Sequence, residues 1–441
     1  DGHLYIEQAI KNGAIAILVE DEVDINSEVT VIRNSDTRKA LAQIAANYYG
    51  SPSKNLRLIG VTGTNGKTSI THLIKAILEE SGKKVGIMGT LYAKIGDREK
   101  NLNHTTPEAL EIEEFMSAAI DEKTDYVVME VSSHALDLHR VDEIDFNVAI
   151  FSNLSQDHLD YHQNMEQYRA AKLKLFKMIN SEENNFSLVN IDDSNAEYFI
   201  NHANGNVLTY GIEESADVRA ENINISLKGT SFVVKYQGLE FKVNMKLIGM
   251  FSVYNALAAI AFALKENVDP KIIKKALEKV SGVPGRFEQI DCGQEFSVIV
   301  DYAHTPDGLE NILKTTKQIV ENRIITVFGC GGDRDRTKRP LMGEIAAKYS
   351  DFCIVTSDNP RSEEPQAIID DIVPGLNKVK DSRYAIIVDR YEAIRHALYL
   401  AKKGDVVIIA GKGHENYQII GDKVLDFDDR KVAREILRST K

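Results

Sequence analysis

The stretch Gly60–Thr68, which reads Gly-Val-Thr-Gly-Thr-Asn-Gly-Lys-Thr, constrains the fold of this chain more than any other. An apolar run precedes it and a helical pattern follows it, so it predicts a strand, a glycine-rich turn and a helix start in succession. Backbone N–H groups exposed by glycine, together with the positive end of the helix dipole, attract an anion. We therefore expect a phosphate-binding loop here rather than a chance glycine-rich turn.

The residue types in this loop indicate a nucleoside triphosphate. Lys67 can reach the terminal phosphates, and the Thr68 hydroxyl can bind the accompanying Mg²⁺. The match to the general nucleotide-binding loop is imperfect, because Val61 stands where that pattern has a glycine. The loop predicts ATP or GTP but does not by itself say which reaction uses the nucleotide.

Composition and charge exclude several classes of protein. The chain has 441 residues, which predicts about three domains, and its hydrophobic content of 43% is that of an ordinary globular protein. A net charge of -13 argues against a nucleic-acid partner. No apolar stretch approaches the roughly 18 residues of a membrane span. The three cysteines form no close metal-type pair, which favours reduced thiols in a cytoplasmic protein. The chain opens without Met or a signal-peptide pattern, so we expect its own beginning to be missing.

Short apolar runs alternate with helical stretches and predict an α/β fold of three domains. Residues 1–55 predict a small, incomplete N-terminal α/β domain. Residues 56–286 predict a central ATP-binding domain with a mostly parallel sheet, which antiparallel strands extend between Val218 and Leu247. Residues 287–441 predict a Rossmann-like C-terminal domain with four strands that each lead into a polar loop. Such sheets bind ligands beyond the carboxyl ends of their strands, so these loops predict a substrate site. The loops are Asp301–Asp307, Gly329–Asp335, Ser357–Arg361 and Gly411–Glu415.

Three positions in the predicted central domain invite a chemical interpretation. Glu130 ends an apolar strand beside the phosphate loop, where a carboxylate can hold Mg²⁺. Asn153–His162 contains two His and two Asp, which either bind a ligand or cap a helix. Zinc is disfavoured because no Cys or regular spacing accompanies them, and His158 is an unusual Mg²⁺ ligand on chemical grounds. Lys172 lies in an ordinary amphipathic helical pattern and, from composition alone, is interpreted as a solvated charge.

Six motifs occur together, and their order is that of the Mur ligases. They are Gly63–Thr68, Glu130 with Ser132–His134, Asp157–Asp160, Ala170–Lys172, Pro284–Glu288 and Asp301–His304. Over essentially its whole length the chain resembles this family of ATP-dependent, amide-forming enzymes of peptidoglycan synthesis. Within the family it is most similar to members that extend UDP-N-acetylmuramoyl-L-alanyl-D-glutamate by a third residue.

The resemblance implies a site for ATP as substrate and Mg²⁺ as cofactor. The ATP contacts would be Gly63, Thr64, Asn65, Gly66, Lys67, Thr68, Asn255, Arg286 and Asp301. The Mg²⁺ ligands would be Thr68, Glu130, His158 and a carbamate formed on Lys172. The catalytic residues would be Lys67, Lys172, Arg286 and His304, with His304 in a positioning role.

The resemblance also implies two further small-molecule substrates. The UDP-muramoyl dipeptide would contact Thr105, Thr106, Ser132 and Arg140, and the incoming amino acid would contact Arg334, Asp358, Asn359, Pro360, Arg361, Gly411 and Glu415. Ser357–Arg361 matches the pattern of members that add meso-diaminopimelate, whose extra carboxylate a guanidinium can pair with. The expected reaction converts the D-glutamate side-chain carboxylate into an acyl phosphate, which the amine of diaminopimelate then attacks. We expect the enzyme to be a monomer.

Four alternatives remain open from the sequence. A lysine-adding Mur ligase is disfavoured by the positive charge of Arg361. A folylpolyglutamate synthetase shares the phosphate loop and the overall plan, but Arg361 and Thr105–Pro107 disfavour it. A nucleotide-binding switch protein is a different class, and Asn377–Lys380 lacks the Asp that a guanine-reading motif needs. Gly329–Gly332 could suggest a dinucleotide oxidoreductase, yet it is not the spaced fingerprint of that class.

Overall fold

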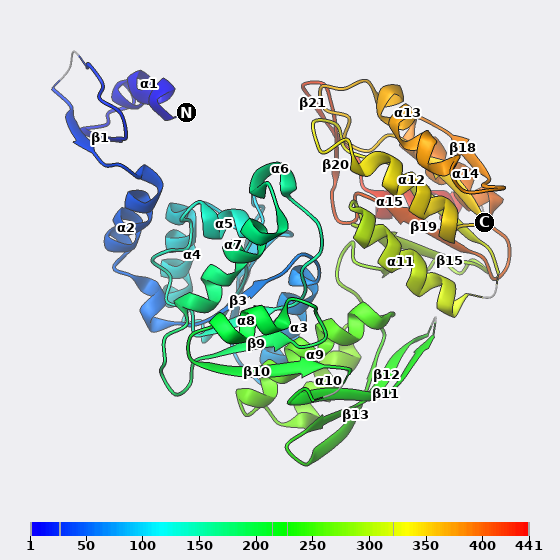
Figure 1. The fold of residues 1–441 in the computed structure, drawn as a ribbon, viewed down its shortest axis with the longest axis horizontal. Coiled ribbons are helices and arrows are strands. Elements are labelled where there is room, and N and C mark those ends of the chain that lie inside the picture. The colour runs from blue at the N-terminus through cyan, green and yellow to red at the C-terminus, as the bar shows by residue number, and fades with distance from the viewer. Residues whose placement is uncertain (1, 26–27, 214, 227, 321, 440–441) are drawn as a thin grey trace.

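The computed structural model describes residues 2–25, 28–213, 215–226, 228–320 and 322–439. It contains three α/β units, with the N-terminal unit in blue and the C-terminal unit in yellow to red on opposite sides of the central one (Figure 1). This arrangement agrees with the predicted fold class. Residues 1 and 441, the outer limits of the predicted domains, and Leu227 in the predicted antiparallel segment lie outside the described residues.

The N-terminal unit is small. Its elements are η1 (Gly2–Tyr5), α1 (Ile6–Lys11), β1 (Ala16–Val19), β2 (Thr30–Arg33) and α2 (Thr37–Tyr49). The strands β1 and β2 pair in parallel. The Asp36 side chain caps α2 by accepting from the Lys39 backbone N–H, and Gly50 ends the helix in the left-handed conformation. The short helix η2 (Pro52–Asn55) follows, and its residues Pro52 and Ser53 are buried.

A single sheet of eleven strands runs through the central unit within the described residues. It is parallel from β11 to β4 and antiparallel at both ends, which confirms the predicted parallel sheet and its antiparallel extension. From one edge to the other the strands are β13 (Leu239–Met245), β12 (Gly229–Tyr236), β11 (Val218–Ser226), β10 (Asn206–Gly211), β9 (Phe186–Asn190), β8 (Val148–Phe151), β3 (Arg57–Thr62), β7 (Tyr126–Glu130), β4 (Val85–Met88), β5 (Ala93–Ile95) and β6 (Arg98–Lys100).

Helices cover both faces of this sheet. Successive residues of β3 alternate between the two faces, so Ile59 and Val61 enter one core and Leu58 enters the other. The first core contains α3 (Lys67–Glu80), α9 (Met250–Lys265) and α10 (Pro270–Lys279). The opposite face carries α4 (Ala109–Asp121), α5 (Ser133–Asp137), α6 (Leu159–His162), α7 (Met165–Met178) and α8 (Ala196–His202). The Ala-rich helix α9 is buried along most of its length.

The C-terminal unit contains a second, six-stranded sheet within the described residues, parallel except for its first edge strand. In spatial order its strands are β14 (Glu288–Gln289), β15 (Ser297–Asp301), β19 (Val406–Ala410), β16 (Ile324–Phe328), β17 (Phe352–Val355) and β18 (Tyr384–Ile386). Its helices are α11 (Pro306–Ile319), α12 (Lys338–Tyr349), α13 (Pro365–Leu376), α14 (Arg390–Leu400) and α15 (Asp429–Ser439), and a separate hairpin pairs β20 (Tyr417–Ile420) with β21 (Lys423–Asp426). Because α11–α13 and α14–α15 contribute to cores on opposite faces, the predicted Rossmann-like layering is confirmed.

Among the residues that the structure describes, no helix combines the length and apolar character needed to cross a bilayer. The cysteines lie at unrelated positions of the C-terminal unit. Cys330 and Cys353 are buried, and Cys292 is partly buried. Burial raises the pKa of the Cys330 and Cys353 thiols to about 12, so both stay protonated at neutral pH.

Candidate active site

The predicted phosphate loop connects β3 to α3. Gly63 and Gly66 have φ angles of 144° and 91°, which side chains rarely adopt. A Cβ atom at Gly63 would overlap Ser152 Oγ, and one at Gly66 would overlap Asn255 Oδ1. Only glycine fits at either position. At Gly66 the reason is that the side chain of Asn255, on α9, lies directly against the loop.

The Lys67 side chain folds back onto this loop. Its Nζ donates to the Gly63 and Thr64 carbonyl oxygens, each at 2.9 Å. Burial lowers the pKa of Lys67, whereas the nearby carboxylates of Glu130 and Asp157 raise it. The Lys67 amine is thus held on a glycine-rich loop at the N-terminus of α3, a position that suits phosphate oxygens.

Glu130 receives three hydrogen bonds beside this lysine. Its side chain accepts from Thr68 Oγ1 at 3.0 Å, from the Thr90 backbone N–H at 2.8 Å and from Thr90 Oγ1 at 3.0 Å. Arg286, the last residue of the predicted central domain, donates from Nη2 to Thr68 Oγ1 at 3.3 Å. The structure therefore brings Thr68, Glu130 and Arg286 together as the sequence predicts.

Lys172 is 1% exposed, so its interpretation as a solvated charge is wrong. Helix α7 turns this residue onto the phosphate loop, where Nζ donates to Gly63 O at 2.8 Å and lies 4.4 Å from the centre of the Tyr168 ring. Burial and the positive charge of Lys67 lower the pKa of Lys172 well below its ordinary value. No helical pattern could reveal this, because the surface that covers Lys172 comes from a segment about a hundred residues away in sequence.

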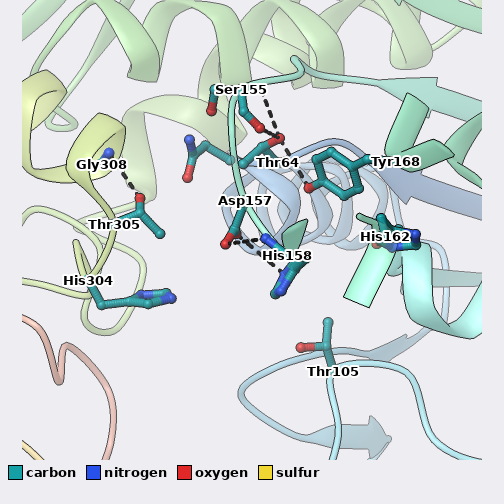
Figure 2. Close-up of polar contacts among 12 residues, drawn as sticks. Thr64, Thr105, Ser155, Asp157, His158, His162, Tyr168, His304, Thr305 and Gly308 are labelled. Atoms are coloured by element: carbon teal, nitrogen blue, oxygen red, sulfur yellow. Dashed lines mark hydrogen bonds and ion pairs between the residues drawn. The ribbon is translucent and has the colours of Figure 1, made fainter. Parts of the chain in front are cut away.

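The histidine-rich loop lies next to Lys172. His158 directly precedes α6 with φ of 54°, and its side chain makes no capping hydrogen bond, so the helix-cap alternative is not supported for this residue. Its Nε2 atom lies 3.4 Å from Asp157 Oδ2, as Figure 2 shows, and its ring centre lies 4.8 Å from that of His134. Burial lowers the pKa of His158 to about 4 despite the opposing effect of Asp157, which leaves a neutral imidazole at pH 7.

A metal at this end of the site would need ligands of several kinds. Among the described residues, no three His, Cys, Asp or Glu side chains converge closely enough to form a metal site by themselves. Two pairs of groups lie around the phosphate loop: the Thr68 hydroxyl contacts the Glu130 carboxylate, and the neutral His158 imidazole lies within the electrostatic influence of the buried Lys172 amine. Conversion of the amine to an anionic oxygen ligand would make the set suitable for Mg²⁺, which prefers oxygen.

A cavity of about 490 Å³ lies between the central and C-terminal units, beside the phosphate loop. Five predicted ATP contacts line it: Asn65, Gly66, Asn255, Arg286 and Asp301. This volume falls in the range of small-molecule sites. Sequence reasoning placed Asp307 in a polar loop but gave it no individual role; it lies on the cavity wall, where its Oδ2 atom accepts from Asn65 Nδ2 at 2.8 Å and from Ser155 Oγ at 2.9 Å. An Asp after a Pro at a helix start gives no signal of this long-range contact.

The remaining predicted residues of this interface are held by backbone contacts. Asp301 accepts from the backbone N–H groups of Phe287 at 2.6 Å and Ala303 at 2.8 Å. Burial raises the pKa of Asp301, and Arg286 opposes that rise. The His304 ring is fixed by a 2.8 Å contact between Nδ1 and the Tyr302 carbonyl oxygen. Figure 2 shows it extending from the C-terminal unit toward Asp157 and His158.

The four predicted dipeptide contacts gather at the end of β7. Thr106 Oγ1 donates to the Glu130 carbonyl oxygen at 2.8 Å and accepts from the Ser132 backbone N–H at 3.0 Å. Arg140 Nη1 donates to the Thr106 carbonyl oxygen at 2.9 Å. Thr105 lies nearby, below His162 in the view of Figure 2. These side chains therefore border the phosphate end of the site.

The predicted amino-acid contacts form a separate group in the C-terminal unit. Asn359 Nδ2 donates to Glu415 Oε2 at 2.9 Å, and a Cβ atom at Gly411 would lie 2.6 Å from Asp358 Oδ2. Arg361, with φ of 53°, donates from Nη1 to the Gly332 carbonyl oxygen at 2.8 Å. The backbone of Pro360 packs against Gly332, and the exposed Arg334 lies at the edge of the group, near Gly331. Lys412, which sequence reasoning left without a role, is buried among them.

A site with this layout can activate one substrate at a nucleotide and receive a second from a neighbouring domain, which is the plan of an ATP-dependent ligase. Residues 61–263 match the Mur ligase middle domain, and residues 285–413 match the family described as Mur ligase, glutamate ligase domain. The chain belongs to the Mur ligase family. It is therefore an ATP-dependent, amide-forming ligase.

Individual relatives agree with this assignment. The chain is 64% identical over 438 residues to a curated UDP-N-acetylmuramoyl-L-alanyl-D-glutamate–2,6-diaminopimelate ligase of Syntrophomonas wolfei subsp. wolfei, a match that covers 99% of this chain and 90% of that protein. A solved structure of an enzyme with the same name is 35% identical, with a TM-score of 0.68 over 99% of this chain and 89% of that chain. The folylpolyglutamate synthase of Mycobacterium tuberculosis has a TM-score of 0.70 over 92% of this chain and 94% of that chain. At 17% identity, that similarity shows the fold alone.

Proposed function

We propose that this ligase adds meso-diaminopimelate to UDP-N-acetylmuramoyl-L-alanyl-D-glutamate in peptidoglycan synthesis, with ATP and Mg²⁺ and through an acyl phosphate. One observation carries the choice of amino acid: Arg361 lies in the same group as the carboxylates of Asp358 and Glu415. Diaminopimelate is lysine with one more carboxylate at its far end, so it presents both charges there. The relative that is 64% identical carries this activity in its name.

Mg²⁺ would be held by Thr68, Glu130, His158 and a carbamate on Lys172. The residues fit this role, because Thr68 and Glu130 are already in contact and the lowered pKa of His158 keeps its imidazole neutral. The lowered pKa of Lys172 favours the neutral amine that reacts with carbon dioxide to form a carbamate. The bound ion would neutralise charge on the phosphates during transfer.

The chain's own residues would carry the rest of the first step. The γ-phosphoryl group passes from ATP to the D-glutamate side-chain carboxylate, a P–O bond to ADP breaks and a P–O bond to the carboxylate forms. Lys67 and Arg286, which both contact the phosphate loop or Thr68, would spread the developing negative charge. The Asn255 and Asp301 contacts would orient the nucleotide in the cavity. The loop Gly63–Thr68 would surround the phosphate groups of ATP.

The second step takes place between the two ends of the site. The amine of diaminopimelate attacks the acyl carbon, phosphate leaves and an amide forms. Thr105, Thr106, Ser132 and Arg140 would hold the muramoyl dipeptide, because they border Glu130 and the phosphate loop. His304 would keep its positioning role, with its ring fixed through the Tyr302 carbonyl.

In the amino-acid pocket, the charges divide into two sets. Arg361 would pair with the far carboxylate of diaminopimelate, and Arg334 at the edge would attract the other. Asp358, Asn359 and Glu415 would receive the ammonium group. Pro360 and Gly411 would shape the backbone around them. A lysine substrate would leave the Arg361 guanidinium without its carboxylate.

We also propose the domain limits 1–55, 56–286 and 287–441, and a cytoplasmic monomer without a nucleic-acid partner. The two sheets and the family matches at 61–263 and 285–413 support these limits. The net charge of -13 supports the absence of a nucleic-acid partner. Size-exclusion chromatography with light scattering would test the oligomeric state.

A direct assay tests the function. The protein is incubated with ATP, Mg²⁺ and the UDP-muramoyl dipeptide, and either meso-diaminopimelate or L-lysine is added. We expect the tripeptide product with diaminopimelate by mass spectrometry, and phosphate release that depends on the dipeptide. Ligation of lysine with equal kcat/KM would favour the lysine-adding alternative, and ligation of glutamate to a folate would favour the folylpolyglutamate synthetase. Phosphate release at the same rate without the dipeptide would contradict the mechanism.

A further inference from the structure

Lys412 is a fully enclosed charge near the amino-acid pocket, with a side-chain exposure of 0%. Its Nζ donates to Asn359 Oδ1 and to the Tyr417 carbonyl oxygen, each at 2.8 Å. It also lies 3.5 Å from Asp358 Oδ1 and 3.6 Å from Glu415 Oε2. These four acceptors come from three segments: the loop after β17, the loop after β19 and the hairpin strand β20.

This arrangement fixes the orientation of the Asn359 amide. Its Oδ1 atom accepts from Lys412 and also from the Ile419 backbone N–H at 3.0 Å. A flipped amide would direct its NH₂ group at these two donors, so the flip is excluded. The Nδ2 group must therefore face Glu415, to which it donates at 2.9 Å.

Lys412 also balances the charge of the pocket. Asp358 and Glu415 are both largely buried, and unpaired buried carboxylates are costly. Burial would raise the pKa of Asp358, but Lys412 and Arg390 hold it below its ordinary value. Burial raises the pKa of Glu415, and Lys412 opposes that rise. Lys412 is thus an ion-pair partner that the two carboxylates share.

We propose that Lys412 is a positioning residue for amino-acid selection: it orients Asn359 and holds Asp358 and Glu415 in place to receive the ammonium group of the substrate, which it does not itself touch. The inference rests on the proposed function, because it assumes that these three residues bind diaminopimelate. It predicts that Lys412 controls KM for the amino acid and leaves the other two substrates unaffected.

Kinetics of Lys412→Met in the full-length enzyme test this role. We expect KM for diaminopimelate to rise by about 20-fold, with KM for ATP and for the UDP-muramoyl dipeptide within about twofold of wild type. Gln418→Leu is the matched control, because buried Gln418 donates to the Asp358 carbonyl oxygen at 2.8 Å but pairs with neither carboxylate. A purely structural role for Lys412 would make the two variants alike.

A double-variant cycle with Glu415→Gln adds a second readout. If Lys412 acts through Glu415, Lys412→Met raises KM for diaminopimelate much less in the Glu415→Gln background than in wild type. Full additivity would contradict the proposal, as would equal rises in all three KM values. If Lys412→Met does not fold, Lys412→Gln replaces it in the double-variant cycle, because a glutamine side chain retains an N–H donor for Asn359. Failure of both variants to fold would assign Lys412 a structural role instead.

Assays of the wild-type enzyme and of Arg361→Met, run beside Lys412→Met, separate this inference from the proposed function. Wild-type enzyme that forms no diaminopimelate product would contradict the function itself. Normal wild-type activity, a raised KM in Arg361→Met and an unchanged KM in Lys412→Met would contradict only the role of Lys412.

Discussion

The phosphate end and the amino-acid end of the site each enclose lysine side chains, but the charges around them differ. Lys67 and Lys172 share the Gly63 carbonyl oxygen, at 2.9 and 2.8 Å, and the structure shows no ion pair for either within the described residues. Lys412, by contrast, lies within 3.6 Å of two carboxylates. One end thus holds two buried amines without ion-pair partners among the described residues, and the other holds a buried lysine that two carboxylates accompany.

The difference matches the charges of the proposed substrates. A buried charge without a partner destabilises a fold. Such a charge is therefore expected at sites where a bound ligand supplies the opposite charge. The triphosphate and a carbamate would bring negative charge to Lys67 and Lys172. Diaminopimelate, whose far end bears one charge of each sign, calls for a pocket that is already balanced. Variants of the two ends should therefore behave differently in activity and in stability.

The largest effect is expected for Lys172→Ala. Loss of the proposed carbamate should lower kcat on the order of 1,000-fold, whereas the melting temperature should stay equal or rise because the buried Lys172 amine has no ion pair to lose. Acetate or propionate added to the assay should restore part of the activity by filling the vacated space with a carboxylate. Steady-state kinetics and thermal unfolding measure both effects.

Lys174→Ala is the matched control for this comparison. Lys174 lies on the same helix, is 45% exposed and pairs with Asp137 at 2.8 Å. Its substitution should leave kcat within about twofold, because Lys174 has no part in the proposed metal site. The melting temperature should also change little, since exposed ion pairs contribute little to stability. A clear loss of stability in Lys172→Ala would show that its charge is balanced in the absence of ligand, and the contrast between the two ends would then fail.

The balance of charge could not be predicted from the sequence, although much of the fold could. The strand, turn and helix of Gly60–Thr68 form one continuous segment, so local patterns and turn chemistry predicted them. The polar loops after β15, β16, β17 and β19 were predicted because parallel strands bring their carboxyl ends to one edge. Lys172, Asp307 and Lys412 depend on contacts with distant segments, and no local pattern distinguishes their burial from exposure. Only the family resemblance gave Lys172 a role.

The second prediction concerns a buried charge that no proposed ligand reaches. Glu113 on α4 is 1% exposed, and neither of its carboxylate oxygens has a hydrogen-bond partner among the described residues. Burial raises the pKa of Glu113 from 4.5 to about 7, and Glu143 and Asp145 add to the rise. Glu113→Gln should increase the free energy of unfolding by about 3 kcal/mol at pH 8, because a shift of one unit is worth about 1.4 kcal/mol.

The sign of the pH dependence follows from the raised pKa. The native state holds the Glu113 proton more tightly than the unfolded chain. The destabilisation that ionised, buried Glu113 causes is therefore absent below the pKa of the unfolded chain. It increases as the pH rises to the pKa of the native state, and above that pKa it reaches its full value. The advantage of Glu113→Gln should therefore shrink between pH 7 and pH 4.5, as urea unfolding at several pH values would show. Exposed Glu114→Gln is the control. A gain that is independent of pH would mean that Glu113 is not the titrating group.

Arg361→Met should have the next largest effect. Removal of the guanidinium should raise KM for diaminopimelate by about 30-fold and narrow the preference over lysine, because charge-assisted hydrogen bonds contribute roughly 2 kcal/mol. Arg336→Met is the control, since Arg336 is 65% exposed and pairs with Asp371. Competition assays with both amino acids give the preference directly. An unchanged preference for diaminopimelate over lysine would mean that a residue other than Arg361 contacts the far carboxylate, with Arg334 as the first candidate.

The smallest effect is expected where the central and C-terminal units meet. Asp307→Ala removes the acceptor of Asn65 Nδ2 and Ser155 Oγ and should raise KM for ATP by about fivefold, roughly 1 kcal/mol. KM for diaminopimelate should not change, because Asp307 contacts the nucleotide cavity and not the pocket around Lys412. Glu310→Ala on the same helix, which removes an ion pair with Lys314, is the control. Equal increases in both KM values would mean that Asp307 governs closure of the two units, and the two ends would then have to be treated as one coupled site.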